Sequence, residues 1–140
     1  MLCKDVMKTN VECLSPTDDV QSAARRMREK NIGAIPVCDD KRTVIGMVTD
    51  RDLALRVIAD SRPATTPLSD VMTKDIVSCR PTDDIQRAQE LMGKHQKSRI
   101  LCTENGRAVG VISLSDIVSR VDGAGAMQTM RQVTAREVRA

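Results

Sequence analysis

The stretch Gly46-Met47-Val48-Thr49-Asp50-Arg51-Asp52 returns later in the chain as Gly110-Val111-Ile112-Ser113-Leu114-Ser115-Asp116. In each copy a glycine opens an apolar run that ends at a hydroxyl residue, and an aspartate follows three positions later. A short apolar run followed by Thr-x-x-Asp or Ser-x-x-Asp is typical of a strand that leads into a capped helix. The two copies therefore predict two equivalent strand-to-helix transitions.

The repetition extends over most of the chain. Asp5-Val6-Met7 returns as Asp70-Val71-Met72, and Pro16-Thr17-Asp18-Asp19 returns as Pro81-Thr82-Asp83-Asp84. These matches share one register, which is shifted only by a single-residue deletion after Arg107. Internal similarity of this kind constrains the architecture, because each copy should form the same structural unit. The chain is therefore predicted to contain two homologous repeats.

Within each repeat, hydrophobic spacing and turn residues predict the order strand, helix, strand, strand, helix. In the first repeat, Val20, Ala23, Ala24 and Met27 have the i, i+3, i+4, i+7 spacing of one helix face. Polar turns separate the two strands that follow, so these strands are expected to form a hairpin. The second helix should begin after Thr49. The predicted strands are residues 11–14, 35–38 and 44–48 in the first repeat and 76–79, 100–103 and 108–112 in the second.

This order predicts an α+β fold made of two pseudo-symmetric βαββα repeats. The first repeat is assigned to residues 1–62, the second to residues 63–125, and residues 126–140 form a tail that is either a short helix or disordered. Residues 59–67, rich in Pro, Ser and Thr, form the linker. A unit of about 60 residues buries only about 60% of its unfolded surface. The two repeats are therefore expected to share one core.

Composition argues against several classes of function. The chain has no Phe, Tyr or Trp, which argues against the aromatic platforms that stack on single-stranded nucleic acid. The net charge of +3 comes from scattered Lys and Arg without a basic stripe, so nucleic-acid binding is not expected. Apolar runs are too short for a membrane span or a signal peptide. These features predict a soluble, cytoplasmic protein.

Residue types that serve metal binding or catalysis are sparse. The five cysteines lie in apolar segments and form no Cys-x-x-Cys pair, which favours reduced, buried thiols. His95 is the single histidine. The sequence contains no recognisable nucleophile–base pair, metal-ligand cluster or P-loop. It therefore predicts a protein that is not an enzyme and that has neither a metal site nor a covalent cofactor.

Two interpretations of the repeated Thr-x-x-Asp and Ser-x-x-Asp motifs are open. In one, the carboxylate accepts hydrogen bonds from the hydroxyls of a ribose, while the hydroxyl side chain and nearby N–H groups favour phosphate. In the other, the motif is a capping box that stabilises a helix start by about 1 kcal/mol without any ligand. Recurrence in both repeats does not separate the two, because both repeats need capped helices.

The chain resembles the cystathionine-β-synthase (CBS) domain family over about residues 3–121. The resemblance is carried by Asp5-Val6-Met7, by residues 15–19, by Ala34-Ile35-Pro36-Val37, and by the two stretches that begin at Gly46 and Gly110. It implies a tandem pair, or Bateman module, whose repeats pack sheet to sheet and leave two clefts. In such modules the clefts bind adenosine-containing ligands: AMP, ADP or ATP, and in some members S-adenosylmethionine or a dinucleotide such as NAD.

The resemblance implies that Ser113 and Asp116 contact the ribose and phosphate in one cleft. Arg99 matches a position where the family often has a phosphate-binding basic residue; its alternative is an ordinary surface arginine. The wall for the purine in this cleft would be Val11, Ile32, Gly33 and Ala34.

Thr49 and Asp52 would serve the second cleft in the same way. The wall for the purine there would be Ile76, Lys97 and Ser98. Ala34 stands where the other repeat has Arg99, so this cleft lacks that phosphate partner unless Arg51 or Lys97 supplies one. The Ser113/Asp116 cleft is therefore expected to bind more tightly.

The function implied is a regulatory sensor of adenosine nucleotides that signals in trans to an unidentified protein. A homodimer is also implied, in which a second copy covers helix faces bearing Met27, Leu53 and Val57. The alternative is a structural or dimerisation module with degenerate ligand sites. The sequence does not distinguish among the ligands, because they share the adenosine moiety.

Overall fold

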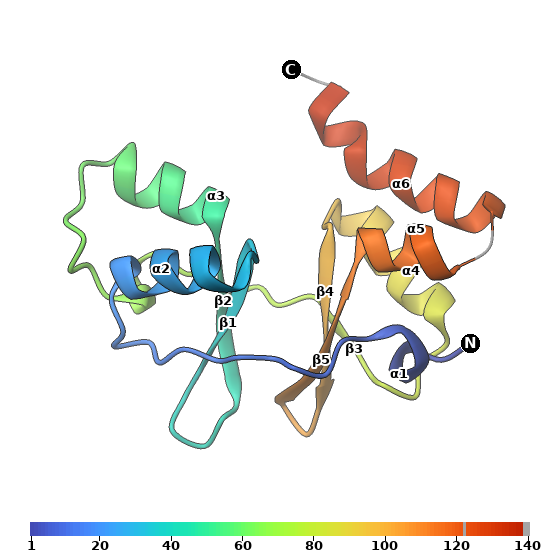
Figure 1. Cartoon of the computed structure of the whole chain (residues 1–140), viewed down its shortest axis with the longest axis horizontal. Helices are drawn as coiled ribbons and strands as arrows, with labels where there is room; N and C mark the ends of the chain where they lie inside the picture. The colour runs from blue at the N-terminus through green and yellow to red at the C-terminus, as the bar shows by residue number, and fades with distance from the viewer. Residues whose placement is uncertain (122, 139–140) are drawn as a thin grey trace. The chain divides into compact units, whose positions relative to one another are not determined.

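The computed structural model of the chain describes residues 1–121 and 123–138 and has an α+β fold (Figure 1). Two β-hairpins recur along the chain, and in each repeat a helix precedes the hairpin and another follows it. The elements are α1 (Cys3–Val6), α2 (Val20–Lys30), β1 (Ala34–Cys38), β2 (Val44–Thr49), α3 (Asp50–Leu53), the π-helical turn η1 (Ala54–Ile58), the 3-10 turn η2 (Leu68–Asp70), β3 (Ser78–Cys79), α4 (Ile85–His95), β4 (Arg99–Glu104), β5 (Arg107–Ser113), α5 (Leu114–Arg120) and α6 (Gly123–Val138).

The chain divides into two compact units whose boundaries differ from those of the sequence repeats. The first unit is Glu12–Ile76. The second unit combines Met1–Val11 with the chain from Val77 onward. The segment that precedes each repeat in sequence, with its Asp-Val-Met motif, therefore belongs to the unit built around the other repeat.

In the first unit, β1 and β2 form an antiparallel hairpin that runs from the pair Ala34/Thr49 to the pair Cys38/Val44. Helices α2 and α3 pack against this hairpin and against each other. Of the apolar face predicted for α2, Val20, Ala23 and Met27 are buried, whereas Ala24 is exposed. Asp19 caps the helix by accepting a hydrogen bond from the Ser22 N–H at 2.8 Å.

In the second unit, β4 lies between β3 and β5, parallel to β3 and antiparallel to β5. Helix α4 packs on β3 and β4, and α5 follows β5 directly. Asp84 caps α4 by accepting from the Gln86 N–H at 2.9 Å, in the position that Asp19 has in the first unit.

The strand predicted at residues 11–14 is reduced to a single bridge between Leu14 and Val37. The cause is Pro36, which has no N–H to donate to the next carbonyl of a parallel partner. In the second unit Leu101 takes the place of Pro36 and pairs with Ser78, so β3 forms there. The prediction of equal first strands in the two repeats was wrong at this position.

The exchanged segments pack on the strands that end at the repeated motif. Lys8 and Val111 exchange backbone hydrogen bonds of 2.9 Å, and Thr73 and Met47 do the same at 2.8 and 2.9 Å. These bonds add a short extra edge to β5 and β2. The Asp-Val-Met segments are thus ordered by backbone pairing as well as by packing.

The C-terminal tail forms α6, which packs against α4 and α5 in the second unit. Ala126, Thr129 and Val133 lie one or two helical turns apart and are buried, whereas Met127 is 52% exposed. Helix α6 therefore contributes one face to the core of the second unit.

Buried side chains of the described residues form two clusters, one in each unit. Each unit closes its core with the exchanged segment, through Leu68 and Val71 in the first unit and Cys3 and Val6 in the second. Each unit therefore buries more apolar surface than its own repeat supplies.

The residues expected to lie on an exposed dimer face are also part of a core. Met27 and Val57 are only 7% and 5% exposed, and Leu53 packs against the same cluster. The amphipathic spacing identified the apolar face of these helices correctly, but that face packs inside the first unit.

Candidate functional site

In the first unit, the hydroxyl residue that ends β2 and the aspartate three positions later bond to each other reciprocally. The Asp52 N–H donates to Thr49 Oγ1 at 3.0 Å, and the Thr49 N–H donates to Asp52 Oδ2 at 2.9 Å. This pair is a capping box. The structural interpretation of the motif is therefore correct for Thr49 and Asp52, and it uses one of the two carboxylate oxygens.

The second unit repeats the arrangement at the end of β5. The Asp116 N–H donates to Ser113 Oγ at 3.1 Å, and the Ser113 N–H donates to Asp116 Oδ2 at 2.9 Å. Ser113 Oγ also lies 2.8 Å from Ser115 Oγ. Asp116 is 8% exposed, a low value for an aspartate.

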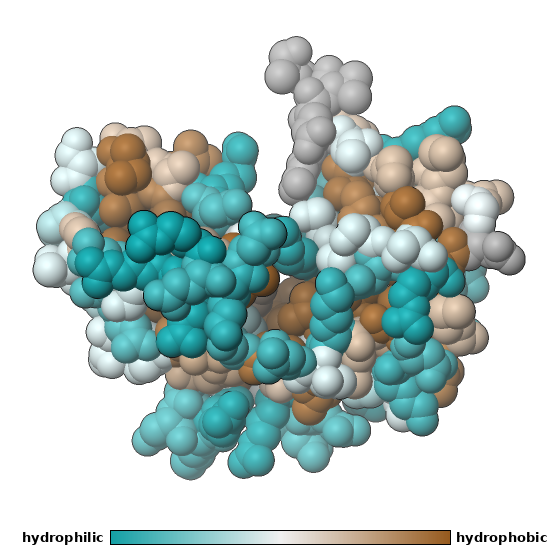
Figure 2. All heavy atoms as spheres, viewed as in Figure 1, coloured by the Kyte–Doolittle hydropathy of each residue, from teal (hydrophilic) through white to brown (hydrophobic). Residues whose placement is uncertain are grey.

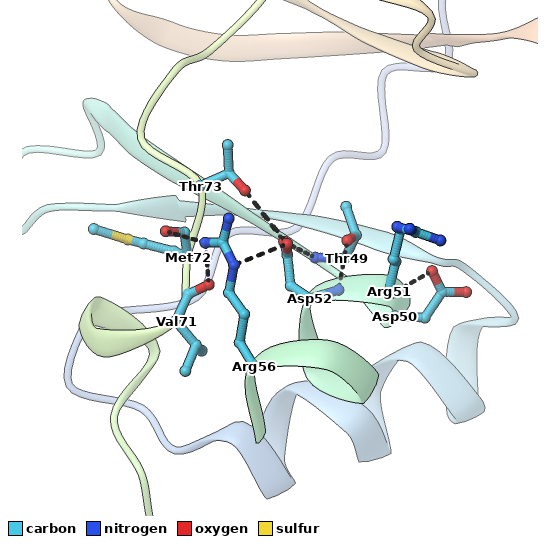
Figure 3. A network of polar contacts seen from close by, with 8 residues as sticks. All are labelled: Thr49, Asp50, Arg51, Asp52, Arg56, Val71, Met72 and Thr73. Atoms are coloured by element: carbon cyan, nitrogen blue, oxygen red, sulfur yellow. Dashed lines mark hydrogen bonds and ion pairs between the residues drawn. The ribbon is translucent and has the colours of Figure 1, made fainter. Parts of the chain in front are cut away.

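The remaining carboxylate oxygen of Asp52 has donors of its own (Figure 3). Thr73 Oγ1 lies 3.4 Å from Asp52 Oδ1, and Arg56 Nε lies 3.9 Å from the same oxygen. The guanidinium of Arg56 also donates to the carbonyls of Val71 and Met72, at 3.0 and 3.3 Å. Asp52 is thus the centre of a network that ties α3 and η1 to the exchanged segment.

Asp116 has a simpler environment. Its Oδ1 lies 3.6 Å from Lys8 Nζ, and the Lys8 side chain is 75% exposed. Lys8 and Thr73 occupy equivalent places, since each pairs through its backbone with the strand that ends at the capping box. A flexible cation therefore faces Asp116 where a short hydroxyl faces Asp52.

Two further predicted site residues lie beside each capping box. Gly33 accepts a hydrogen bond from the Asp50 N–H at 3.0 Å, and Ala34 pairs with Thr49 across the hairpin. In the second unit, Ser98 accepts from the Leu114 N–H at 2.7 Å and Arg99 pairs with Ser113. Arg99 is exposed, and it forms no ion pair with the residues that the structure describes.

The structure divides each predicted cleft between the two units. The first unit holds Thr49 and Asp52 together with Ile76, and the second holds Ser113 and Asp116 together with Arg99 and Val11. The remaining wall residues belong to the opposite unit in each case: Ile32, Gly33 and Ala34 for one cleft, Lys97 and Ser98 for the other. Each unit thus supplies a half-site, defined here as its capping box and the residues beside it. Assembly of the two half-sites into clefts remains a prediction.

Sequence reasoning missed three residues that contact the motif aspartates: Lys8, Arg56 and Thr73. Arg56 stands one helical turn after Asp52, so i,i+4 spacing could have identified it. Lys8 and Thr73 follow the two Asp-Val-Met motifs directly, but their contacts depend on the exchange of segments between repeats.

All five cysteines are free thiols, as predicted, and four of them are buried. Cys79 Sγ lies 3.5 Å from Cys102 Sγ and 3.6 Å from Cys3 Sγ. Burial, followed by the neighbouring Cys79, raises the pKa of the Cys3 thiol from 9.0 to about 12. Among the residues described here, no group of His, Cys, Asp or Glu is arranged to hold a metal ion.

The duplicated hairpins and paired capping boxes define a tandem-repeat α+β protein with two related half-sites. A model of the CBS domain matches residues 3–59 and 68–123. The chain belongs to the CBS-domain family, and a pair of CBS domains is a regulatory module.

Relatives agree with this assignment. The CBS domain-containing protein YhcV of Bacillus subtilis is 40% identical over 114 residues, which are 81% of each chain. Hypoxic response protein 1 of Mycobacterium tuberculosis is 28% identical over 131 residues, covering 93% of this chain and 92% of that protein. A crystal structure of Hypoxic Response Protein I with two coordinated zinc ions has a TM-score of 0.79 and 28% identity, and the match covers 87% of this chain and 100% of that one.

The same fold occurs in the CBS domain pair of protein MJ0100, solved in complex with 5-methylthioadenosine and S-adenosyl-L-methionine. That structure has a TM-score of 0.78 and 20% identity, and the match covers 85% of this chain and 94% of that chain. Within the described part of this protein, every helix is too short or too polar to cross a membrane.

Proposed function

We propose that the protein is a regulatory sensor that binds an adenosine-containing ligand through its two half-sites and signals to a partner protein in trans. The ligand candidates are AMP, ADP and ATP, with S-adenosylmethionine and NAD as further members of the class. On this proposal the chain carries out no reaction of its own and acts by a difference in ligand affinity between two conformations.

One observation carries the proposal: each capping box uses only one oxygen of its aspartate. Oδ2 of Asp52 and of Asp116 accepts the strand-end N–H, while Oδ1 is within reach of outside donors, Thr73 in one case and Lys8 in the other. A carboxylate oxygen held beside a hydroxyl at a strand end suits the vicinal hydroxyls of a ribose, which are hydrogen-bond donors. Capping and ligand binding are therefore compatible roles for the same side chain.

The complex of MJ0100 with two adenosine compounds supports the choice of ligand class, because its fold matches this one over most of the chain. The absence of aromatic residues means that the purine would pack against aliphatic side chains. Ile32, which is 38% exposed, is one apolar side chain available for such a contact. The free thiols are in keeping with a reducing compartment such as the cytoplasm.

The test is calorimetry with AMP, ADP, ATP, NAD and S-adenosylmethionine on the wild type and on Asp116→Ala and Asp52→Ala. We expect at least one ligand to bind, and at least one aspartate variant to weaken its binding tenfold or more. Loss of the cap alone should lower stability by only about 1 kcal/mol. Asp40→Ala, which removes an exposed carboxylate of a turn, is the matched control and should leave binding unchanged.

Two results would contradict the proposal. One is the absence of binding for all five compounds. The other is a loss of binding in the aspartate variants that is fully explained by their loss of folding stability, measured by urea denaturation. In that case Asp52 and Asp116 would serve only as helix caps.

A second candidate function, a dimerisation module, is favoured by exposed apolar side chains on the first unit. Leu55 is 50% and Ile58 is 76% exposed, on the helical segment that continues α3, where Figure 2 shows apolar surface. Side chains of this size are rarely left so exposed in a group, and a second copy of the chain would cover them. Ile58→Lys should then raise the dimer dissociation constant in sedimentation equilibrium. A monomeric wild type would remove this candidate.

A further inference from the structure

The two half-sites differ at one equivalent position, Lys8 in the second unit and Thr73 in the first. Both residues follow an Asp-Val-Met motif, and both exchange two backbone hydrogen bonds with the strand that leads to the capping box. Their main chains are therefore held in the same place, and their side chains point to equivalent aspartates. The difference between the half-sites is one of side-chain chemistry.

At Asp52 the outer oxygen is bonded by groups that are themselves fixed. Thr73 has a short side chain on a backbone that is paired with Met47, so its hydroxyl stays close to Asp52. Arg56 is anchored by the carbonyls of Val71 and Met72 in addition to Asp52 (Figure 3). Neither group can follow a ligand away from the carboxylate without breaking other contacts.

At Asp116 the outer oxygen is paired with a group that is free to move. The ammonium of Lys8 makes one ion pair of 3.6 Å, and its side chain is 75% exposed. Water solvates the exposed ammonium well, so Lys8 loses little when it leaves, whereas the carboxylate of Asp116, whose side chain is only 11% exposed, needs another donor in its place. The hydroxyls of a sugar can therefore replace Lys8 at Asp116, and the released ammonium remains tethered within a side-chain length of the site.

Arg99 adds a second mobile cation to the same half-site. It pairs with Ser113 across the hairpin, is exposed, and forms no ion pair within the described part of the chain. Its counterpart in the first unit is Ala34, as the counterpart of Lys8 is Thr73. Two positions beside Ser113 and Asp116 are thus cationic where the other repeat has neutral residues.

We propose that Lys8 makes the Ser113/Asp116 half-site selective for a phosphorylated nucleoside over the free nucleoside. The ammonium leaves Asp116 when the ribose binds and pairs with the phosphate, with Arg99 assisting. The Thr49/Asp52 half-site has no such switchable cation at the equivalent position, so it discriminates less between the phosphorylated and the free nucleoside. This inference rests on the proposed function and identifies the class of ligand that one half-site prefers.

The test exchanges the two residues between the repeats. Lys8→Thr gives the second unit the residue that the first unit carries, so the variant keeps a side chain that this backbone already accommodates. Lys4→Thr is the control: it removes the same charge from an exposed residue of the same segment. Adenosine and AMP are titrated by calorimetry into the wild type and both variants at low and moderate NaCl concentration.

In the wild type we expect AMP to bind at least tenfold more tightly than adenosine, and salt to weaken AMP more than adenosine. Lys8→Thr should reduce this preference about tenfold by weakening the binding of AMP. The affinity for adenosine should be unchanged or slightly higher, because Lys8 no longer competes with the ribose for Asp116. Lys4→Thr should keep the wild-type preference. The melting temperature of each variant reports its folding.

The outcomes separate the two proposals. If adenosine and AMP both bind and Lys8→Thr keeps the wild-type preference, the inference about Lys8 is wrong and the sensor proposal stands. If Lys8→Thr weakens adenosine and AMP equally, Lys8 supports the fold of the site and does not select phosphate. If neither compound binds the wild type, the inference about Lys8 fails, and the sensor proposal is then decided by the calorimetry with ADP, ATP, NAD and S-adenosylmethionine.

Discussion

The thioether of Met7 lies directly over Gly110, in the space that a Cβ on residue 110 would occupy. Met72 covers Gly46 in the same manner in the first unit. This relationship explains why the Asp-Val-Met motif and the glycine of the strand recur together: the methionine of each exchanged segment needs a strand position without a side chain.

Gly110→Ala is therefore expected to destabilise the protein by about 1–3 kcal/mol, because the added methyl overlaps Met7 and forces the segment to shift. Urea denaturation of Gly110→Ala, Met7→Ala and the double variant measures the effect. In the double variant the loss should be smaller than the sum of the two single losses, since Met7→Ala opens the space. Additive losses would mean that Met7 and Gly110 are not in contact.

Val133→Ala should lower stability by about 2 kcal/mol, since Val133 is 1% exposed and its two methyl groups pack in the core of the second unit. Met127→Ala, on the exposed side of the same helix, should change stability by less than about 0.5 kcal/mol. Equal effects of the two substitutions would show that α6 does not pack through the face that carries Val133.

Pro36→Leu should lengthen the bridge at Leu14 into a strand pair like that of β3 and β4. Leucine at position 36 supplies the N–H that proline lacks, and Leu101 shows that the equivalent place accepts this side chain. Hydrogen exchange followed by NMR should detect a protected amide at residue 36. The reverse substitution, Leu101→Pro, should lose the pairing of Ser78 and cost about 1–3 kcal/mol. An exchanging amide at residue 36 would contradict the explanation given for the missing strand.

Alkaline pH should destabilise the protein through its buried thiols. The pKa of Cys3 is raised by burial to about 12, whereas the thiol in the unfolded chain ionises near 9.0. The stabilising contribution of the neutral thiol is therefore complete below pH 9 and is lost as the pH rises from about 9 toward 12. Cys3→Leu, which copies Leu68 of the first unit, should make the free energy of unfolding decline less steeply over this range. An identical slope in both proteins would show that Cys3 does not take part.

The repeat made the order of the elements predictable, because two aligned copies reinforce each weak local signal. The hairpin strands and the helix starts at Thr49 and Ser113 were assigned within a residue or two. The capping role of Asp52 and Asp116 was one of two interpretations that the motif allowed, and the structure establishes it. Local spacing carries this information because capping acts over three residues.

The exchange of segments could not be predicted, because no local pattern in the sequence indicates with which repeat an Asp-Val-Met segment pairs after folding. The pairing of Lys8 with Asp116 and of Thr73 with Asp52 depends on that exchange. The packing of Met27 and Val57 inside the first unit was missed because an apolar helix stripe indicates burial but not the partner that buries it. Tertiary contacts between distant segments decided these points.

The exchange of leading segments has a consequence for the history of the chain. A protein with a single repeat and its own Asp-Val-Met arm could complete its core in this manner only if two identical molecules exchanged their arms. Fusion of two such genes would turn a segment exchange between separate molecules into an intramolecular exchange. In a fused chain the two arms can differ in sequence, as they do here at Lys8 and Thr73.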